Sequence, residues 1–157
     1  MKKKNVKTEQ VLAAWNVLNG AKYGKLEDAD KIKVWKATRA LRPIAERFDE
    51  DSKDAAQKMK PMEDYDERLT KAQEYERLVK VPEFDAGKLP IGAAEYAEFI
   101  EVFKKYQKLV GETVREFAQK EVEVAVEPLS EEAFGKLMAS NDWTLAQVDA
   151  VSEVLVV

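Results

Sequence analysis

The chain has 157 residues, about the length of one domain, and its 26 basic and 30 acidic residues give a net charge of -4. It contains neither cysteine nor histidine, which excludes disulfide frameworks, thiolate zinc sites, thiol nucleophiles and histidine-based catalysis or metal binding. No apolar run reaches the ~18 residues of a membrane span, and no apolar stretch follows the basic Met1-Lys2-Lys3-Lys4. We therefore expect a soluble, cytoplasmic protein.

Residues 8–19 predict a first helix. Apolar residues recur at helical spacing from Val11 to Leu18, and Thr8 is placed to cap the helix. Asn19-Gly20 predicts that this helix ends at a residue with a left-handed backbone conformation.

A second, longer helix is predicted over residues 26–60. Val34, Leu41 and Phe48 recur every seven residues within a broad apolar stripe. Pro43 interrupts this stripe, and proline removes a backbone hydrogen bond and clashes with the preceding turn. We expect a kink or break near Leu41.

Two further helices are predicted on either side of a Pro- and Gly-rich loop. The first covers residues 62–79, with Pro61 placed to begin it, and the second covers 93–119. The second shows two heptad seams typical of coiled-coil packing: Tyr96, Phe103, Val110 and Phe117, and Ala93, Ile100, Gln107 and Val114. As a polar residue in an apolar seam, Gln107 would set the register of this helix against its packing partner. Four tyrosines are expected to stack between the two helices: Tyr65, Tyr75, Tyr96 and Tyr106.

The period changes to two over residues 121–127, where Val122, Val124 and Val126 alternate with glutamates. A single strand would leave its backbone groups unpaired, and the lysine-rich segment 2–7 is the best partner for it. Residues 1–60 carry a net charge of +6 and residues 121–157 one of -7, so this pairing also explains the charge asymmetry.

Two short helices complete the chain, over residues 130–139 and 144–155. Ser130 is placed to cap the first, and Thr144 with Gln147 forms a capping box for the second. The predicted fold is mostly α: one domain, residues 1–157, with an antiparallel helical hairpin or bundle and a two-stranded β ribbon formed by the N-terminus and residues 121–127.

This order of elements resembles a family of small phage and prophage proteins of unknown function with a helical-hairpin build. The resemblance is carried by the segments Lys4–Val11, Ala40–Glu46 and Glu121–Ser130, of which Glu-Val-Glu-Val followed by Leu-Ser is the most specific. It implies a phage gene context and a bacterial host cytoplasm, and no catalytic residues.

Carboxylates are numerous on the third and fourth helices, but without histidine they do not match the ligand set of four-helix di-metal sites, and we expect them on a solvated face. The sequence predicts no catalytic residue, no metal and no cofactor. An enzyme using carboxylates or a Lys/Tyr pair would require a deep pocket whose groups have displaced pKa values.

The leading hypothesis is a non-enzymatic phage or prophage accessory protein that binds other proteins or itself, with virion assembly as one setting. Its interaction edge would be the strand containing Val122, Val124 and Val126, if one edge of that strand stays open. The alternative is a nucleic-acid-binding module in the basic N-terminal third, with contacts from Lys22, Lys25, Lys33, Lys36 and Arg39. Trp15 and Trp35 are nearby but are expected in the core, and the acidic balance of the chain opposes phosphate binding.

Overall fold

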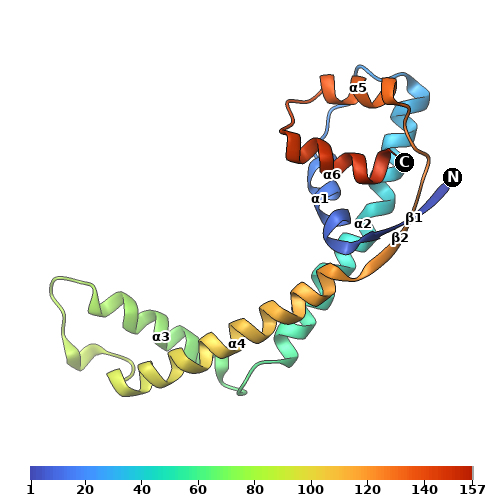
Figure 1. Ribbon diagram of the computed structural model, residues 1–157. Coiled ribbons are helices and arrows are strands. Elements are labelled where there is room, and N and C mark those ends of the chain that lie inside the picture. Colours follow the sequence, from blue (N-terminus) through green and yellow to red (C-terminus); the bar gives the residue numbers. More distant parts are fainter. Residues whose placement is uncertain (157) are drawn as a thin grey trace. The chain divides into compact units, whose positions relative to one another are not determined.

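The computed structural model describes residues 1–156 (Figure 1). Its elements in chain order are β1 (Lys2–Lys7), α1 (Thr8–Leu18), α2 (Asp28–Lys58), α3 (Tyr65–Val79), the 3-10 turn η1 (Ala86–Lys88), α4 (Ala93–Gln119), β2 (Glu121–Val126), α5 (Glu131–Ala139) and α6 (Leu145–Leu155). The prediction of a mostly α fold with a small β ribbon is confirmed. None of the helices within residues 1–156 has the length and apolar character that crossing a bilayer requires.

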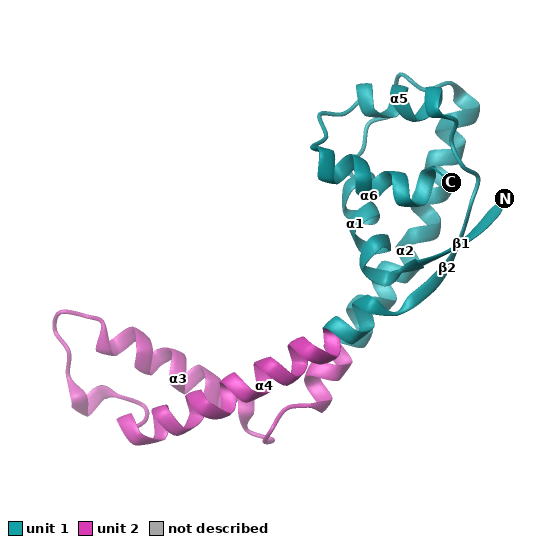
Figure 2. Cartoon of the chain, viewed as in Figure 1, with its two compact units in different colours: residues 1–52, 115–157 teal, residues 53–114 magenta. Residues whose placement is uncertain are grey.

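The chain divides into two compact units (Figure 2). Unit 1 comprises Met1–Ser52 and Arg115–Val157, and unit 2 comprises Lys53–Val114. Helices α2 and α4 each contribute residues to both units. The expectation of a single domain therefore stays a prediction.

The β ribbon joins the two stretches of chain that form unit 1, and it pairs the segments that the charge pattern predicted. β1 pairs antiparallel with β2, with Lys2 opposite Val126 and Lys7 opposite Glu121. Val6, Val124 and Val126 are buried on one face. On the other face, the Lys3 Nζ lies 3.4 Å from the Glu123 Oε1, an exposed ion pair that contributes little to stability. The valine face is thus what holds the ribbon on the protein.

The core of unit 1 lies beneath this ribbon, where α1 packs against α6. Its most completely buried large side chains come from four helices: Val11, Val34, Leu41, Leu137, Val151, Val154 and Leu155. Lys4 extends from β1 over the core and donates a 2.6 Å hydrogen bond from its Nζ to the Glu153 carbonyl of α6. This contact between β1 and α6 joins segments that are distant in sequence.

Two local expectations are wrong, and a third is wrong in part. Thr8 lies inside α1, and its hydroxyl donates a 2.8 Å hydrogen bond to the Lys120 carbonyl instead of capping the helix. Asn19 has a right-handed backbone conformation at φ -59°, and no residue within 1–156 has positive φ, so α1 ends without a left-handed residue. Helix α2 is continuous through Pro43, so the expected break is absent and the expected kink stays a prediction.

The other helix ends follow side-chain chemistry. The Ser130 Oγ accepts a hydrogen bond from the Ala133 amide at 3.1 Å, and the Thr144 Oγ accepts one from the Gln147 amide at 3.3 Å. These two caps were predicted correctly. Pro61 does not begin α3; it lies in the turn after α2, and the helix begins at Tyr65.

Unit 2 is built on aromatic contacts between α3 and α4. Tyr75 stacks on Tyr96 with ring centroids 4.3 Å apart, and Tyr65 lies 4.8 Å from Tyr106 and 5.7 Å from Phe99. The expected tyrosine packing is confirmed.

The second heptad seam of α4 was placed one residue too far along the chain. Phe99 is the buried residue of α4, so the inner line runs through Phe99 and Tyr106 and not through Ile100 and Gln107. Gln107 is exposed and sets no register. Phe103 and Val110 of the first seam are half-buried.

Candidate functional site

Helix α2 presents two large apolar side chains to solvent on unit 1. Val34, Ala37 and Leu41 form its buried row, whereas Ile32 and Trp35 are 52% and 50% exposed. Trp35 was expected in the core, and this expectation is wrong because a residue next to Val34 is turned by about 100° around the helix. Trp15 of α1 is half-buried and does pack against the core.

Trp35 lies in an open groove of about 370 Å³ lined by Trp15, Thr38, Arg39 and Arg42. The guanidinium carbon of Arg39 lies 5.3 Å from the centroid of the Trp35 ring, within the range of a cation–π interaction. Arg42 is paired with Glu46 at 2.8 Å. We call Trp15, Trp35, Thr38, Arg39 and Arg42 the Trp35 groove.

The Trp35 groove combines an aromatic surface with guanidinium groups held by one helix. Trp and Arg are the residue types most enriched at the energetic centres of protein interfaces, because they bury large areas and also donate hydrogen bonds. The same pair can stack on a nucleic-acid base. A protein partner or a nucleic acid would bind to a surface that is already formed in the free protein.

Three of the five basic residues predicted to contact nucleic acid make contacts within the protein. The Lys25 Nζ donates a 3.1 Å hydrogen bond to the Ala139 carbonyl, and the Lys33 Nζ lies 3.8 Å from the Asp30 carboxylate. Lys22 is held through its backbone, which exchanges two hydrogen bonds with the Asn141 side chain. Lys36 and Arg39 are both exposed on α2 and follow Trp35 in the chain.

The predicted interaction edge lies over the core of unit 1. Val124 and Val126 are each 3% exposed, and Val122 is partly buried against the same cluster. These side chains serve the fold. Among residues 1–156 the sheet has two strands, so each strand has one edge with no strand neighbour there, and a role for that edge in binding stays a prediction.

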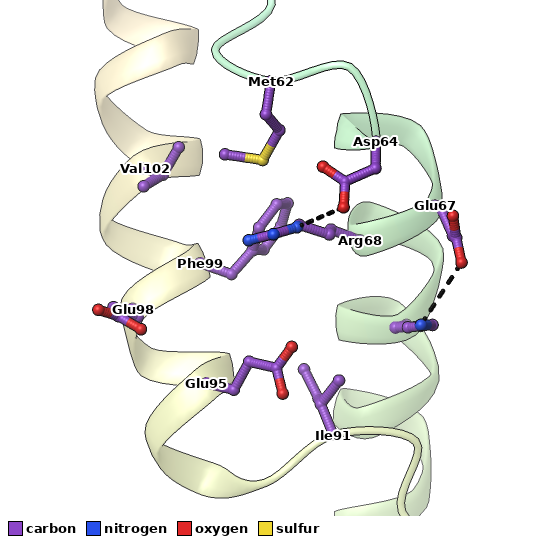
Figure 3. Close-up of a pocket in the computed structure, with 10 residues that line it drawn as sticks. Met62, Asp64, Glu67, Arg68, Ile91, Glu95, Glu98, Phe99 and Val102 are labelled. Carbon is purple, nitrogen blue, oxygen red and sulfur yellow. Dashed lines mark hydrogen bonds and ion pairs between the residues drawn. The ribbon is translucent and has the colours of Figure 1, made fainter.

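Unit 2 contains a second concave surface, between α3 and α4 (Figure 3). It has a volume of about 350 Å³. Its apolar part comes from Met62, Ile91, Phe99 and Val102, and its charged part from Asp64, Glu67, Arg68, Lys71, Glu95 and Glu98. We call this set the α3–α4 pocket; it was not anticipated from the sequence.

Ion pairs along α3 organise one wall of the pocket. The Arg68 Nε donates a 2.9 Å hydrogen bond to the Asp64 Oδ2, and the Lys71 Nζ lies 3.5 Å from the Glu67 Oε1. The hydrogen bond from Arg68 lowers the pKa of Asp64, and the same bond, with the nearby charges of Glu95 and Glu98, raises the pKa of Arg68. Both groups are charged at neutral pH.

Two tyrosines of unit 2 also have displaced pKa values. The Tyr96 hydroxyl donates a hydrogen bond to the Glu76 carboxylate, which raises the pKa of Tyr96 to about 12. Burial raises the pKa of Tyr65. Both shifts favour the neutral phenol near neutral pH.

Over residues 1–156, no group of three or more acidic side chains is placed to hold a metal ion. Comparisons with known proteins identify no relative: no protein-family model matches the chain, and neither a curated protein nor a solved structure is significantly similar.

Proposed function

We propose that this is a non-enzymatic protein that acts by binding other proteins, and that the Trp35 groove is its principal contact surface. One observation carries the proposal: a tryptophan that is half exposed beside Arg39, on a helix whose adjacent face forms part of the core. Burying the rest of a tryptophan ring stabilises a complex, whereas leaving it in water does not stabilise the free protein.

The biological setting that we propose comes from the resemblance to small phage and prophage proteins. In that setting the protein acts in the cytoplasm of a bacterial host, as an accessory factor for virion assembly. Its partner is a phage-encoded protein or a second copy of the chain.

Gel filtration with light scattering tests the proposal. The pure protein is run alone and after incubation with lysate from phage-producing cells, and its mass is compared between the two runs. We expect an increase in mass that Trp35→Ala removes. Leu145→Ala is the matched control, because Leu145 is 77% exposed elsewhere on unit 1 and its loss should leave the complex intact. A strict monomer that retains no partner in either run would refute the proposal.

Nucleic-acid binding is the second candidate function. It is supported by the Trp35–Arg39 pair together with the exposed Lys36, which could stack on a base and neutralise a phosphate. Fluorescence anisotropy with short single-stranded DNA, duplex DNA and RNA tests it. The candidate requires binding that weakens steeply as salt rises and that Trp35→Ala reduces. If none of the three probes binds at low salt, this candidate is rejected.

A further inference from the structure

We propose that the α3–α4 pocket of unit 2 binds a partner polypeptide through one basic side chain, lysine or arginine, flanked by an aliphatic residue. The inference rests on the proposed function as a protein-binding protein, and it adds a second surface and the chemistry of its ligand.

The apolar side of the pocket sets the size and character of the ligand. Phe99 is 5% exposed and forms the floor, with Met62, Ile91 and Val102 around it (Figure 3). The volume of about 350 Å³ is at the small end of ligand-binding pockets. It suits a few side chains of an extended segment and is too small for a folded element.

The charged side of the pocket determines the sign of the charge that the ligand carries. Four carboxylates and two cations line the pocket. Asp64 and Glu67 are each paired with a cation on α3. Glu95 and Glu98 of α4 have no cation at ion-pair distance within residues 1–156, although the charge of Arg68 lies near both. The side chain of Glu95 points toward the space between the helices (Figure 3). An incoming ammonium or guanidinium group would find carboxylates that form no ion pair at contact distance, beside apolar side chains.

Other ligand classes fit this pocket less well. An anion would meet a net negative site, because four carboxylates and two cations line the pocket. Arg68 is also already bonded to Asp64. A metal ion would require several converging carboxylates, and the described residues hold no such group. A long basic side chain satisfies both parts of the pocket, because its aliphatic stem packs on apolar groups while its charged end reaches the carboxylates.

The probe for this proposal is the peptide acetyl-Leu-Arg-Leu-amide, titrated into the isotopically labelled full chain and followed by amide NMR shifts. We expect saturable shifts around Glu95 and Phe99, weakened by added salt. Acetyl-Leu-citrulline-Leu-amide has the same shape without the charge and should bind at least about fivefold more weakly, as expected for the loss of exposed charge pairs.

The double variant Glu95→Gln/Glu98→Gln should weaken the arginine peptide to the level of the citrulline peptide. Glu101→Gln is the matched control, because Glu101 is also exposed on α4 but does not line the pocket, and it should leave the affinity unchanged. All three side chains are exposed, so the variants should fold. Equal binding of the two peptides, or insensitivity to the double variant, would overturn the proposal.

Light scattering of the pure protein tests whether a second copy of the chain occupies the pocket. Self-association that is abolished by Glu95→Gln/Glu98→Gln would show that a second copy fills the pocket, and would overturn the assignment to a separate partner. Failure of the peptide titration, with Trp35-dependent partner capture intact, would remove this inference alone. Loss of capture with peptide binding intact would instead remove the Trp35 groove.

Discussion

Leu137 and Leu145 form a matched pair of sites in the C-terminal helices of unit 1. Leu137 of α5 is 0% exposed within the core, whereas Leu145 at the start of α6 is 77% exposed. Substitution by alanine removes the same atoms at both sites. Any difference in the free energy of unfolding therefore measures burial.

Leu137→Ala should lower the free energy of unfolding by about 2–5 kcal/mol, the sum of the lost transfer free energy and the cavity left behind. Leu145→Ala should change it by less than about 0.5 kcal/mol, because its side chain is mostly hydrated in the folded state.

Urea unfolding followed by tryptophan fluorescence measures both values. The chain has three tryptophans, Trp15, Trp35 and Trp143, and all lie in unit 1, so the signal reports on that unit. The dependence on urea should keep the same slope in both variants. Equal losses for the two leucines would refute the placement of α5 in the core.

Three further outcomes are expected. Phe99→Ala should destabilise unit 2 by about 3–5 kcal/mol and reduce the protection of α3 and α4 amides from hydrogen exchange; unchanged protection would contradict the burial of this ring. Thr144→Ala should cost about 0.5–2 kcal/mol by leaving the Gln147 amide unbonded, and Thr144→Ser should restore most of the loss in urea titrations. An NMR titration should give Asp64 a pKa below 3.8, and this pKa should rise in Arg68→Gln. Because the folded-state pKa is lowered, the contribution of this pair to stability is present at neutral pH and is lost as the pH falls through that pKa. An Asp64 pKa at or above 3.8 would argue against the hydrogen bond.

The fold was largely predictable because its signals are periodic or depend on opposite charge. The alternation in residues 121–127 and the lysines of residues 2–7 predicted the ribbon, and apolar residues at helical spacing predicted the first four helices. Capping chemistry predicted the starts of α5 and α6. The prediction of a helix break failed at Pro43, because the residues on both sides of this proline continue one helix, α2.

The candidate sites were harder to predict because they depend on which of two neighbouring residues faces the core. Val34 and Trp35 are both apolar, and the sequence placed both on one broad stripe, whereas the helix buries the first and exposes the second. The same uncertainty placed the inner line of α4 at Ile100 instead of Phe99. The α3–α4 pocket also requires Ile91 from the intervening loop, and no periodic pattern places that residue.

Photo-crosslinking from position 36 tests the central claim most directly. Lys36 is exposed next to Trp35 and does not line the Trp35 groove, so its replacement leaves the groove intact. A benzophenone amino acid is introduced at position 36, or at position 145 as the control, and the full chain is irradiated in phage-producing cells. The Trp35 groove predicts a single discrete adduct from position 36, absent from position 145 and lost when Trp35→Ala is added. No adduct from position 36, or the same adducts from both positions, would contradict it.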